Sequence, residues 1–473
     1  MKLTRIPALA LALSAAATVA TAADRVEDLA TVYQRALQAD PRMQQAEALH
    51  LATRETRTQA WLAMLPLDAS ASKNWTGVGS DRTTNPAIGT VALQVNLFSW
   101  NNWVNLKQSS AIVAQGEANY VAAQYDLIAR VAQQYFGVLS AQDTLTAQDS
   151  ALQSVARQLE QAERRYEVGL IAITDVQIAR ASRDSSAAAV IAARRQLASS
   201  QEQLRAITGE KYAALAAPRE DMPLLTPEPA SEDAWVAAAM DQNASLNAAR
   251  MAAEISRDNY LAAWGGHLPA INVSASRSWD LENGNNAATP PPVGTTTNTS
   301  DIVWQIGVSV PVFSAGATQS KVRQAHYNYS AAKSALDVVS RQTEQQARDA
   351  YQGVISQIAQ VQALKQAVES NRVSLAATEA GYEVGTKTAV DVLTARQLLV
   401  AAQTSYAQAK YGYLNNVVAL RQAAGNLDRK TIDEINGWLA PPPVPAATPA
   451  ATEPPPVAPA SPAPASVPPS AQN

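Results

Sequence analysis

The sequence contains one phrase twice, "YEVGLIAITDVQIAR" at Tyr166–Arg180 and "YEVGTKTAVDVLTAR" at Tyr382–Arg396. The two phrases begin 216 positions apart, since 382 − 166 = 216. Three further pairs occur in the same order in both halves: "LPLDASASKNW" with "LPAINVSASRSW", "VNLFS" with "VPVFS", and "LRAITG" with "LRQAAG". Four ordered matches indicate an internal duplication, so we expect one plan of helices and strands to be built twice.

Each half predicts the order helix, strand, strand, long helix, long helix. In the first half these elements are expected at about 25–63, 67–78, 90–98, 103–166 and 174–208, and Pro41 is expected to kink or interrupt the opening helix. In the second half they are expected at about 231–265, 271–281, 302–313, 317–382 and 389–425. We therefore divide the chain into a first repeat at 23–210, a proline-rich linker at 211–230 and a second repeat at 231–439.

The two ends of the chain differ in character from the repeats. Residues 1–22 are predicted to be a signal peptide, because a charged start and an apolar run precede the cleavage pattern Ala20-Thr21-Ala22. Residues 440–473 are rich in proline and alanine with almost no charge, which is typical of a disordered tail. Beyond the signal peptide no run of ~18 apolar residues remains, so any membrane crossing is expected to use β-strands.

The composition gives no indication of an enzyme. The chain has no cysteine and three widely separated histidines, and no nucleophile motif, phosphate loop or metal-ligand cluster can be identified. We expect neither a cofactor nor a metal. The net charge of −4 gives no indication of a surface that binds nucleic acid.

The predicted strands alternate between apolar and polar residues. In "VALQVNLF", Val91, Leu93, Val95 and Leu97 share one face, opposite smaller and polar residues. This pattern over ~10 residues fits a strand with one face in lipid, although a soluble sandwich stays open as an alternative. Aromatic residues at or near the strand ends are expected at the membrane interface: Trp75, Phe98, Trp100, Trp279, Trp304 and Phe313.

Four strands per chain are too few to close a transmembrane sheet, and an open edge in lipid leaves backbone groups unpaired. Three copies would supply twelve strands. The helices add length, because 64 residues at 103–166 span roughly 95 Å and carry narrow apolar seams typical of coiled coils. The expected fold is mainly α with a small β part: a long α-helical coiled-coil tunnel, with four strands per chain in a twelve-stranded trimeric barrel.

The chain resembles the TolC family of trimeric outer-membrane channel-tunnels, on the repeated "YEVG" phrases, "GHLPAI" at 266–271 and "AGYEVGT" at 380–386. The resemblance covers about 26–439 and implies an exit duct for type I protein secretion and multidrug efflux. It implies a homotrimer in the outer membrane of a Gram-negative bacterium, extending into the periplasm. The implied partners are outer-membrane lipid, a periplasmic adaptor, and an inner-membrane ABC, RND or major-facilitator pump.

Each "YEVG" is expected where an outgoing long helix reverses into a returning one, because glycine accepts the backbone conformation of such a turn. In the family these tips surround the periplasmic mouth and receive the adaptor. The corresponding residues are Val168, Gly169, Leu170, Val384, Gly385 and Thr386.

The resemblance also implies an aperture. Asp391 would face the lumen, where three copies form an acidic ring that attracts cations. The family has a second acidic position one turn later, where this chain has Thr394, so we expect three carboxylates in the ring. The alternative, in which Asp391 is an N-terminal helix charge, stays open.

Polar links between helix pairs hold the mouth closed in the family. The matching pairs are Asp175 with Tyr382, Thr174 with Lys387, and Gln158 with Glu379. Lys387 replaces an arginine and is expected to make a looser link. A competing interpretation is a periplasmic coiled-coil scaffold or adaptor without a pore, which the two hairpins and the membrane-type strands make less favourable.

Overall fold

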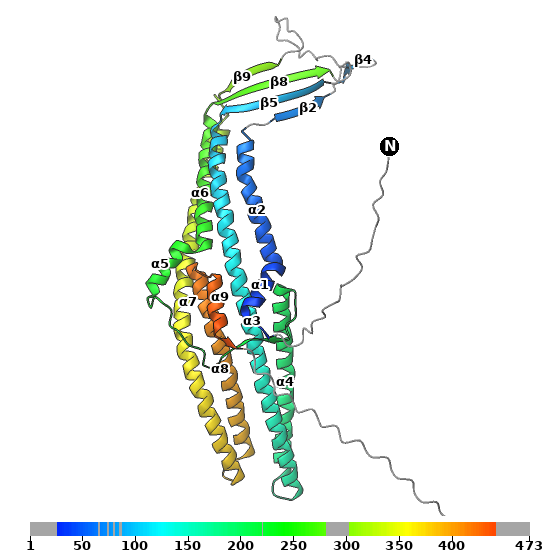
Figure 1. Cartoon of the computed structure of the whole chain (residues 1–473), viewed down its shortest axis with the longest axis vertical. Coiled ribbons are helices and arrows are strands. Elements are labelled where there is room, and N and C mark those ends of the chain that lie inside the picture. Colours follow the sequence, from blue (N-terminus) through cyan, green and yellow to red (C-terminus); the bar gives the residue numbers. More distant parts are fainter. Residues whose placement is uncertain are drawn as a thin grey trace, which may run out of the picture.

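The computed structural model describes residues 26–64, 67–72, 75–78, 81–84, 88–219, 221–280 and 302–440. The predicted signal peptide and almost all of the predicted tail lie outside these residues. The described chain forms an elongated body with a sheet at one end and the tips of two helical hairpins at the other (Figure 1). This arrangement confirms the predicted combination of long helices with few strands.

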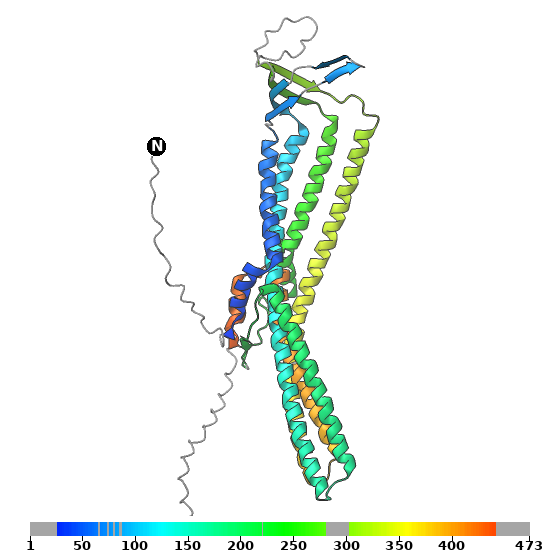
Figure 2. The same ribbon diagram turned by 90° about the vertical axis from the view of Figure 1, so that its right-hand side faces the viewer.

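Six long helices give the body its length: α2 (Pro41–Leu62), α3 (Trp100–Glu167), α4 (Ile173–Thr208), α6 (Ala244–Trp264), α7 (Ala317–Glu383) and α8 (Ala389–Ala424). Near the sheet, α2 packs on α3, α3 on α6, and α6 on α7. Further from the sheet, α3 pairs with α4 and α7 with α8, and α3 contacts α8 (Figure 2). Within the described residues, none of these helices combines the length and hydropathy needed to cross a bilayer.

The opening helix of each repeat is broken in two by one polar residue. Asp40 ends α1 (Leu29–Ala39) and caps α2, where Pro41 takes the first helical position. Asn243 likewise ends α5 (Glu232–Gln242) and caps α6 by accepting from the Leu246 N–H at 3.0 Å. The break at Pro41 was predicted. The single helix predicted at 231–265 was wrong, because Asn243 carries no sequence signal as strong as proline.

The main sheet is antiparallel, in the order β2-β5-β8-β9. Its strands are β2 (Leu67–Ser72), β5 (Ile88–Phe98), β8 (Ala270–Asp280) and β9 (Val303–Ser309). The short strands β3 (Trp75–Val78) and β4 (Asp81–Thr84) form a separate pair, so the predicted strand at 67–78 is interrupted. The strand predicted at 302–313 ends at Ser309, two residues before Pro311, which cannot donate a ladder hydrogen bond.

The register places the alternating residues of all four strands in step. One row across the sheet is Leu67, Leu93, Ala275 and Trp304, and a second apolar row on the same face is Val95, Val273 and Ile306. Between them, on the opposite face, lies the polar row Gln94, Ser274 and Gln305. The predicted apolar and polar faces are therefore continuous from strand to strand.

The apolar face of the sheet is not covered by a second sheet in the described residues. Leu67, Trp304 and Ile306 are 68%, 70% and 73% exposed. A soluble sandwich would bury these side chains in its core, so the structure does not support that alternative.

The middle of the body contains small elements that the sequence did not predict. Strand β1 (Val26–Glu27) pairs with β6 (Ala214–Leu215), and β7 (Ala217–Pro218) pairs with β10 (Leu439–Ala440). Helix α9 (Arg429–Gly437) belongs to the same region, whereas the 3₁₀ turn Gly265–His267 joins α6 to β8 next to the sheet. The fully buried Tyr135 of α3 ties this region together, since its hydroxyl donates to the Ala216 carbonyl at 2.7 Å.

Candidate channel mouth and membrane-facing sheet

The two repeated phrases form the two hairpin tips, with the same backbone geometry. In the first tip Gly169 has φ +75°, the Gly169 N–H donates to the Tyr166 carbonyl, and the Leu170 N–H donates to the Arg165 carbonyl. In the second tip Gly385 has φ +80°, with matching bonds to the Tyr382 and Gly381 carbonyls. Both tips are Schellman motifs, which need a left-handed residue after the helix. The predicted reason for each glycine is confirmed by its φ angle.

Each tip presents apolar side chains to solvent. Val168, Leu170 and Val384 are 69%, 73% and 75% exposed. Gly385 is followed by the exposed Thr386, whose hydroxyl donates back to the Gly381 carbonyl at 3.0 Å. The tips, at the lower end of Figure 1, thus combine a hydrogen-bonded turn with exposed apolar groups.

Asp391 caps the start of α8. One of its carboxylate oxygens accepts from the Thr388 N–H at 2.8 Å and from the Thr388 hydroxyl at 2.9 Å, while the Thr388 hydroxyl accepts from the Asp391 N–H. These bonds complete a capping box and, with nearby Lys387, hold the pKa of Asp391 below its usual value. Both hydrogen bonds engage Oδ2, and the side chain is exposed. Capping and facing a lumen are therefore compatible.

The exposed Thr394 lies one turn further along α8. Its hydroxyl donates to the Val390 carbonyl at 2.9 Å within the same helix. A hydroxyl satisfied in this way adds no charge beside Asp391.

The residues predicted to link the hairpins are placed near the mouth, but not all are joined within one chain. Among the described residues, no hydrogen bond or ion pair joins Asp175 to Tyr382 or Thr174 to Lys387. Instead the Arg165 guanidinium of α3 lies over the Tyr382 ring, 5.5 Å from its centre. The Asp175 and Thr174 pairings remain predictions.

Gln158 and Glu379 are brought together by a third residue, Arg396. The Arg396 guanidinium donates to the Gln158 side-chain carbonyl in α3 at 3.3 Å and forms an ion pair with Glu379 in α7 at 2.5 Å. Its side chain is only 12% exposed. Arg396 therefore connects three helices at the level where Gln158 and Glu379 were expected to meet.

The same arginine position has a simpler role in the first repeat. Arg180 closes the first phrase and pairs with Glu163 across its own hairpin at 3.0 Å, 17 positions away. Arg396 and Glu379 are also 17 positions apart. Both hairpins thus contain the arginine–glutamate pair, and the second also makes the contact with Gln158.

A second polar contact joins α3 to α8 further up the body. The Tyr411 hydroxyl donates to the Asp143 carboxylate at 2.7 Å, and burial with this neighbouring charge raises the pKa of Tyr411. The two contacts are the same number of residues apart on each helix, 15 on α3 (158 − 143 = 15) and 15 on α8 (411 − 396 = 15). Between them lies a cavity of about 440 Å³ among α3, α4 and α8, with small side chains such as Ala151, Ser182, Ser185, Ser186, Ala189 and Ala401 in its wall.

The aromatic residues predicted for the membrane interface fall into three groups. Phe98, Trp304 and Phe313 are exposed, at 36%, 70% and 89%. Trp100 is half-buried, because its indole N–H donates to the Leu261 carbonyl at 2.9 Å and its ring meets Trp264 edge-on. The side chains of Trp75 and Trp279 lie outside the described residues.

Three residues of interest were missed in the sequence. Trp61 is the second-last residue of α2 and is 56% exposed, and Trp264 ends α6 and is 46% exposed, so both belong with the aromatic residues near the sheet. Their signal was available, since each lies a few residues before a predicted strand. Arg396 closes the repeated phrase, but its partner in α3 could not be inferred without the packing of the hairpins.

The fold and both ends of the molecule define a channel-tunnel class of protein, and comparisons with known proteins agree. The model of the outer membrane efflux protein family matches residues 32–210 and 235–426. The outer membrane protein TolC of Vibrio cholerae is 34% identical over 438 residues, covering 91% of this chain and 98% of the relative. TolC of Escherichia coli is 32% identical over 425 residues, covering 88% and 86%. The chain therefore belongs to the outer membrane efflux protein family.

Solved structures share the fold. The outer-membrane channel OprN superposes with a TM-score of 0.71 at 17% identity, over 84% of this chain and 90% of the other. The outer membrane protein VceC of Vibrio cholerae gives a TM-score of 0.70 at 20% identity, over 85% and 97%. As a family member, the chain is an outer-membrane protein of a Gram-negative bacterium that extends into the periplasm.

Proposed function

We propose that three copies of this chain form an outer-membrane duct through which proteins and small molecules leave the cell. The sheet carries this proposal. Strands β2 and β9 are its two edges, with no further strand paired to either in the described residues. The exposed apolar face fits lipid, but the unpaired backbone groups of the two edges are costly there unless another copy completes the ladder.

The upper helices are arranged in the same order as the strands of the sheet. Helices α2 and α7 are the outermost of the four upper helices, just as β2 and β9 are the outermost strands. In the proposed trimer, β9 and α7 of one copy meet β2 and α2 of the next, which closes a twelve-stranded sheet and a helical wall together. The polar row Gln94, Ser274 and Gln305 then lines the bore.

The names of the relatives support the proposed classes of transported substrate. Besides the TolC proteins, the alkaline protease secretion protein AprF of Pseudomonas aeruginosa is 27% identical over 417 residues, covering 85% of each chain. The duct proposed here serves protein secretion and drug efflux, and substrate choice rests with an inner-membrane pump. A periplasmic adaptor joins that pump to the hairpin tips. No catalytic step or cofactor enters the proposal.

The mouth is proposed to close through the hairpin contacts. Arg396 with Gln158 and Glu379, and Arg165 with Tyr382, hold α7 and α8 against α3. Three copies place three Asp391 carboxylates beside the opening. Release of these contacts would widen the mouth.

The test is the mass and the conductance of the detergent-extracted protein. We expect a trimer that forms discrete, cation-selective channels in planar bilayers. A stable monomer without channel activity would favour the scaffold interpretation and overturn the duct.

A further inference from the structure

A groove lies between α2 and α3 where both helices approach the sheet. It is open to solvent, has a volume of about 680 Å³, and is lined by Arg57, Thr58, Trp61, Trp103, Leu106, Lys107 and Ser110. Helix α2 ends at Leu62, five residues before β2 begins, and α3 begins two residues after β5 ends. The groove is therefore next to the sheet.

The groove changes character along its length. Trp61 and Trp103 form its end nearer the sheet, and each is 56% exposed. Arg57 and Lys107 each lie four residues further from the sheet, which is about 6 Å along a helix. The wall is thus aromatic toward the sheet and basic away from it, with hydroxyls from Thr58 and Ser110 at the basic end and no acidic residue.

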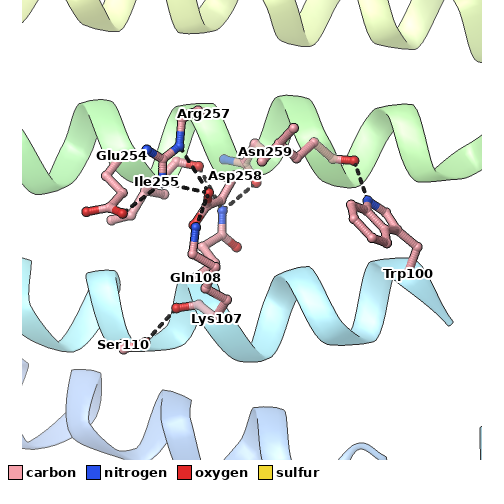
Figure 3. Close-up of polar contacts among 10 residues, drawn as sticks. Trp100, Lys107, Gln108, Ser110, Glu254, Ile255, Arg257, Asp258 and Asn259 are labelled. Carbon is pink, nitrogen blue, oxygen red and sulfur yellow. Dashed lines mark hydrogen bonds and ion pairs between the residues drawn. The ribbon is translucent and has the colours of Figure 1, made fainter. Parts of the chain in front are cut away.

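The Lys107 ammonium is paired with a buried acid on the neighbouring helix. Its ammonium lies 3.4 Å from Oδ1 of Asp258 in α6, a side chain that is 1% exposed, while the lysine side chain itself is 60% exposed (Figure 3). Arg257 approaches the same Oδ1 at 3.3 Å. Arg257 stays beside Asp258 if the exposed Lys107 side chain turns from α6 toward the groove, so this turn leaves the buried carboxylate with a cationic partner.

We infer that this groove binds one phospholipid molecule per subunit, with the phosphate on Arg57 and Lys107 and the glycerol ester region against Trp61 and Trp103. The inference rests on the proposed membrane position of the sheet. A lipid at the periplasmic surface has its acyl chains toward the sheet and its phosphate away from it, which is the order of the groove wall. The net charge of −4 describes the whole chain and gave no indication that Arg57 and Lys107 lie together.

The test compares lipid retention by wild type and variants, using native mass spectrometry of the detergent-extracted trimer. Dioleoyl-phosphatidylglycerol is the probe, and dioleoylglycerol, which has the same acyl chains without phosphate, is its chemical control. We expect wild type to retain phosphatidylglycerol and not dioleoylglycerol. The Arg57→Gln/Lys107→Gln variant should bind phosphatidylglycerol about 30-fold more weakly.

The matched variant is Arg194→Gln/Arg195→Gln, which removes the same charge from exposed positions in α4 and should bind like wild type. Trp61→Ala/Trp103→Ala should also lose lipid. Equal retention by wild type and the Arg57/Lys107 variant would overturn the inference, as would full displacement by inorganic phosphate, which would indicate a free-anion site. If the Arg57→Gln/Lys107→Gln variant no longer forms a trimer, the groove is a contact between subunits, and this result would also overturn the lipid inference.

Channel conductance of the same preparations separates this inference from the proposed function. A trimer that conducts but retains no lipid would contradict only the lipid site and not the duct. A preparation that does not conduct would contradict the proposed duct, whether or not it retains lipid.

Discussion

Arg396 and Gln158 lie 238 positions apart in the sequence and are joined by a hydrogen bond of 3.3 Å. This bond crosses from the second hairpin to the first, whereas the equivalent Arg180 stays within its own hairpin with Glu163. One residue type at one repeated position therefore has two roles. The difference between those roles supplies the first test of the mouth.

Replacement of Arg396 by glutamine should open the mouth. A contact of this kind contributes about 1 kcal/mol per subunit, so three copies would change the closed-to-open ratio by about a hundredfold. Single-channel recordings should show higher conductance or longer open times. Arg180→Gln is the matched control, since it removes the same charge within one hairpin, and should record like wild type. Equal traces for all three proteins would exclude Arg396 from gating.

The double variant Tyr382→Phe/Lys387→Ser should also raise single-channel conductance. It removes the hydroxyl and the ammonium predicted to reach Asp175 and Thr174, and it keeps the aromatic ring beneath Arg165. Individual exposed links contribute only about 0–1 kcal/mol, so the single variants should have smaller effects. A double variant that conducts like wild type would remove these pairings from the gate.

Asp391 should make cation block depend on pH. Thr388 and Lys387 lower the pKa of this carboxyl below its usual 3.8, so the aspartate keeps its charge at neutral and mildly acidic pH. Block by a multivalent cation should persist down to that lowered pKa and be lost as pH falls through it. The contribution of the helix cap to folding stability should be lost over the same pH range, because the cap hydrogen bonds favour the ionised carboxylate of the folded protein. Asp391→Asn should be insensitive to the cation at every pH, and persistent block in that variant would place the ring elsewhere.

Gly385→Ala should loosen the second tip. The residue has φ +80° and nothing near a new Cβ, so the cost is backbone strain of about 1 kcal/mol. The Thr386 amide should then exchange its hydrogen about fivefold faster. Gly137→Ala, also in open space but inside α3, should leave that amide unchanged and favour its own helix. Slower exchange at Thr386 in the Gly385 variant would contradict the assigned turn.

Adjacent residues of β9 test which face of the sheet meets lipid. Ile306→Lys places a charge on the apolar face and should reduce outer-membrane insertion by about 2–4 kcal/mol per copy if it lies near the middle of the bilayer. Gln305→Lys places the same charge on the polar face and should insert normally while changing ion selectivity. Both proteins can be quantified as trimers in membrane fractions. The reverse order of effects would mean that the two faces have been exchanged.

Short-range signals in the sequence were enough for the long helices, the sheet faces and the tips. The tip glycines could be assigned because a Schellman turn needs a left-handed residue at one position, and the register of the strands follows from their alternation. The repeated phrase fixed the positions of both reversals. Apart from the repeat itself, these features depend on residues that are close together in the sequence.

The remaining features depend on contacts between distant segments. Strands β1 and β10 have two residues each and exist only because β6 and β7 lie beside them. Asn243 interrupts a helix because it can cap α6 and also donate to the Ala423 carbonyl, 180 positions away. The role of Arg396, and the position of Arg57 beside Lys107 in the proposed lipid groove, likewise depend on how distant helices pack together.

The shared geometry of the two tips has a consequence for stoichiometry. In a trimer the backbone repeats six times around the opening, because the Schellman turn at Gly169 matches that at Gly385. The side chains repeat only three times, since Leu170 in one turn corresponds to Thr386 in the other. A partner ring with six equal arms would fit the shape at every position and yet meet two alternating surfaces. Such a partner must either tolerate both surfaces or contact the opening as three unequal pairs.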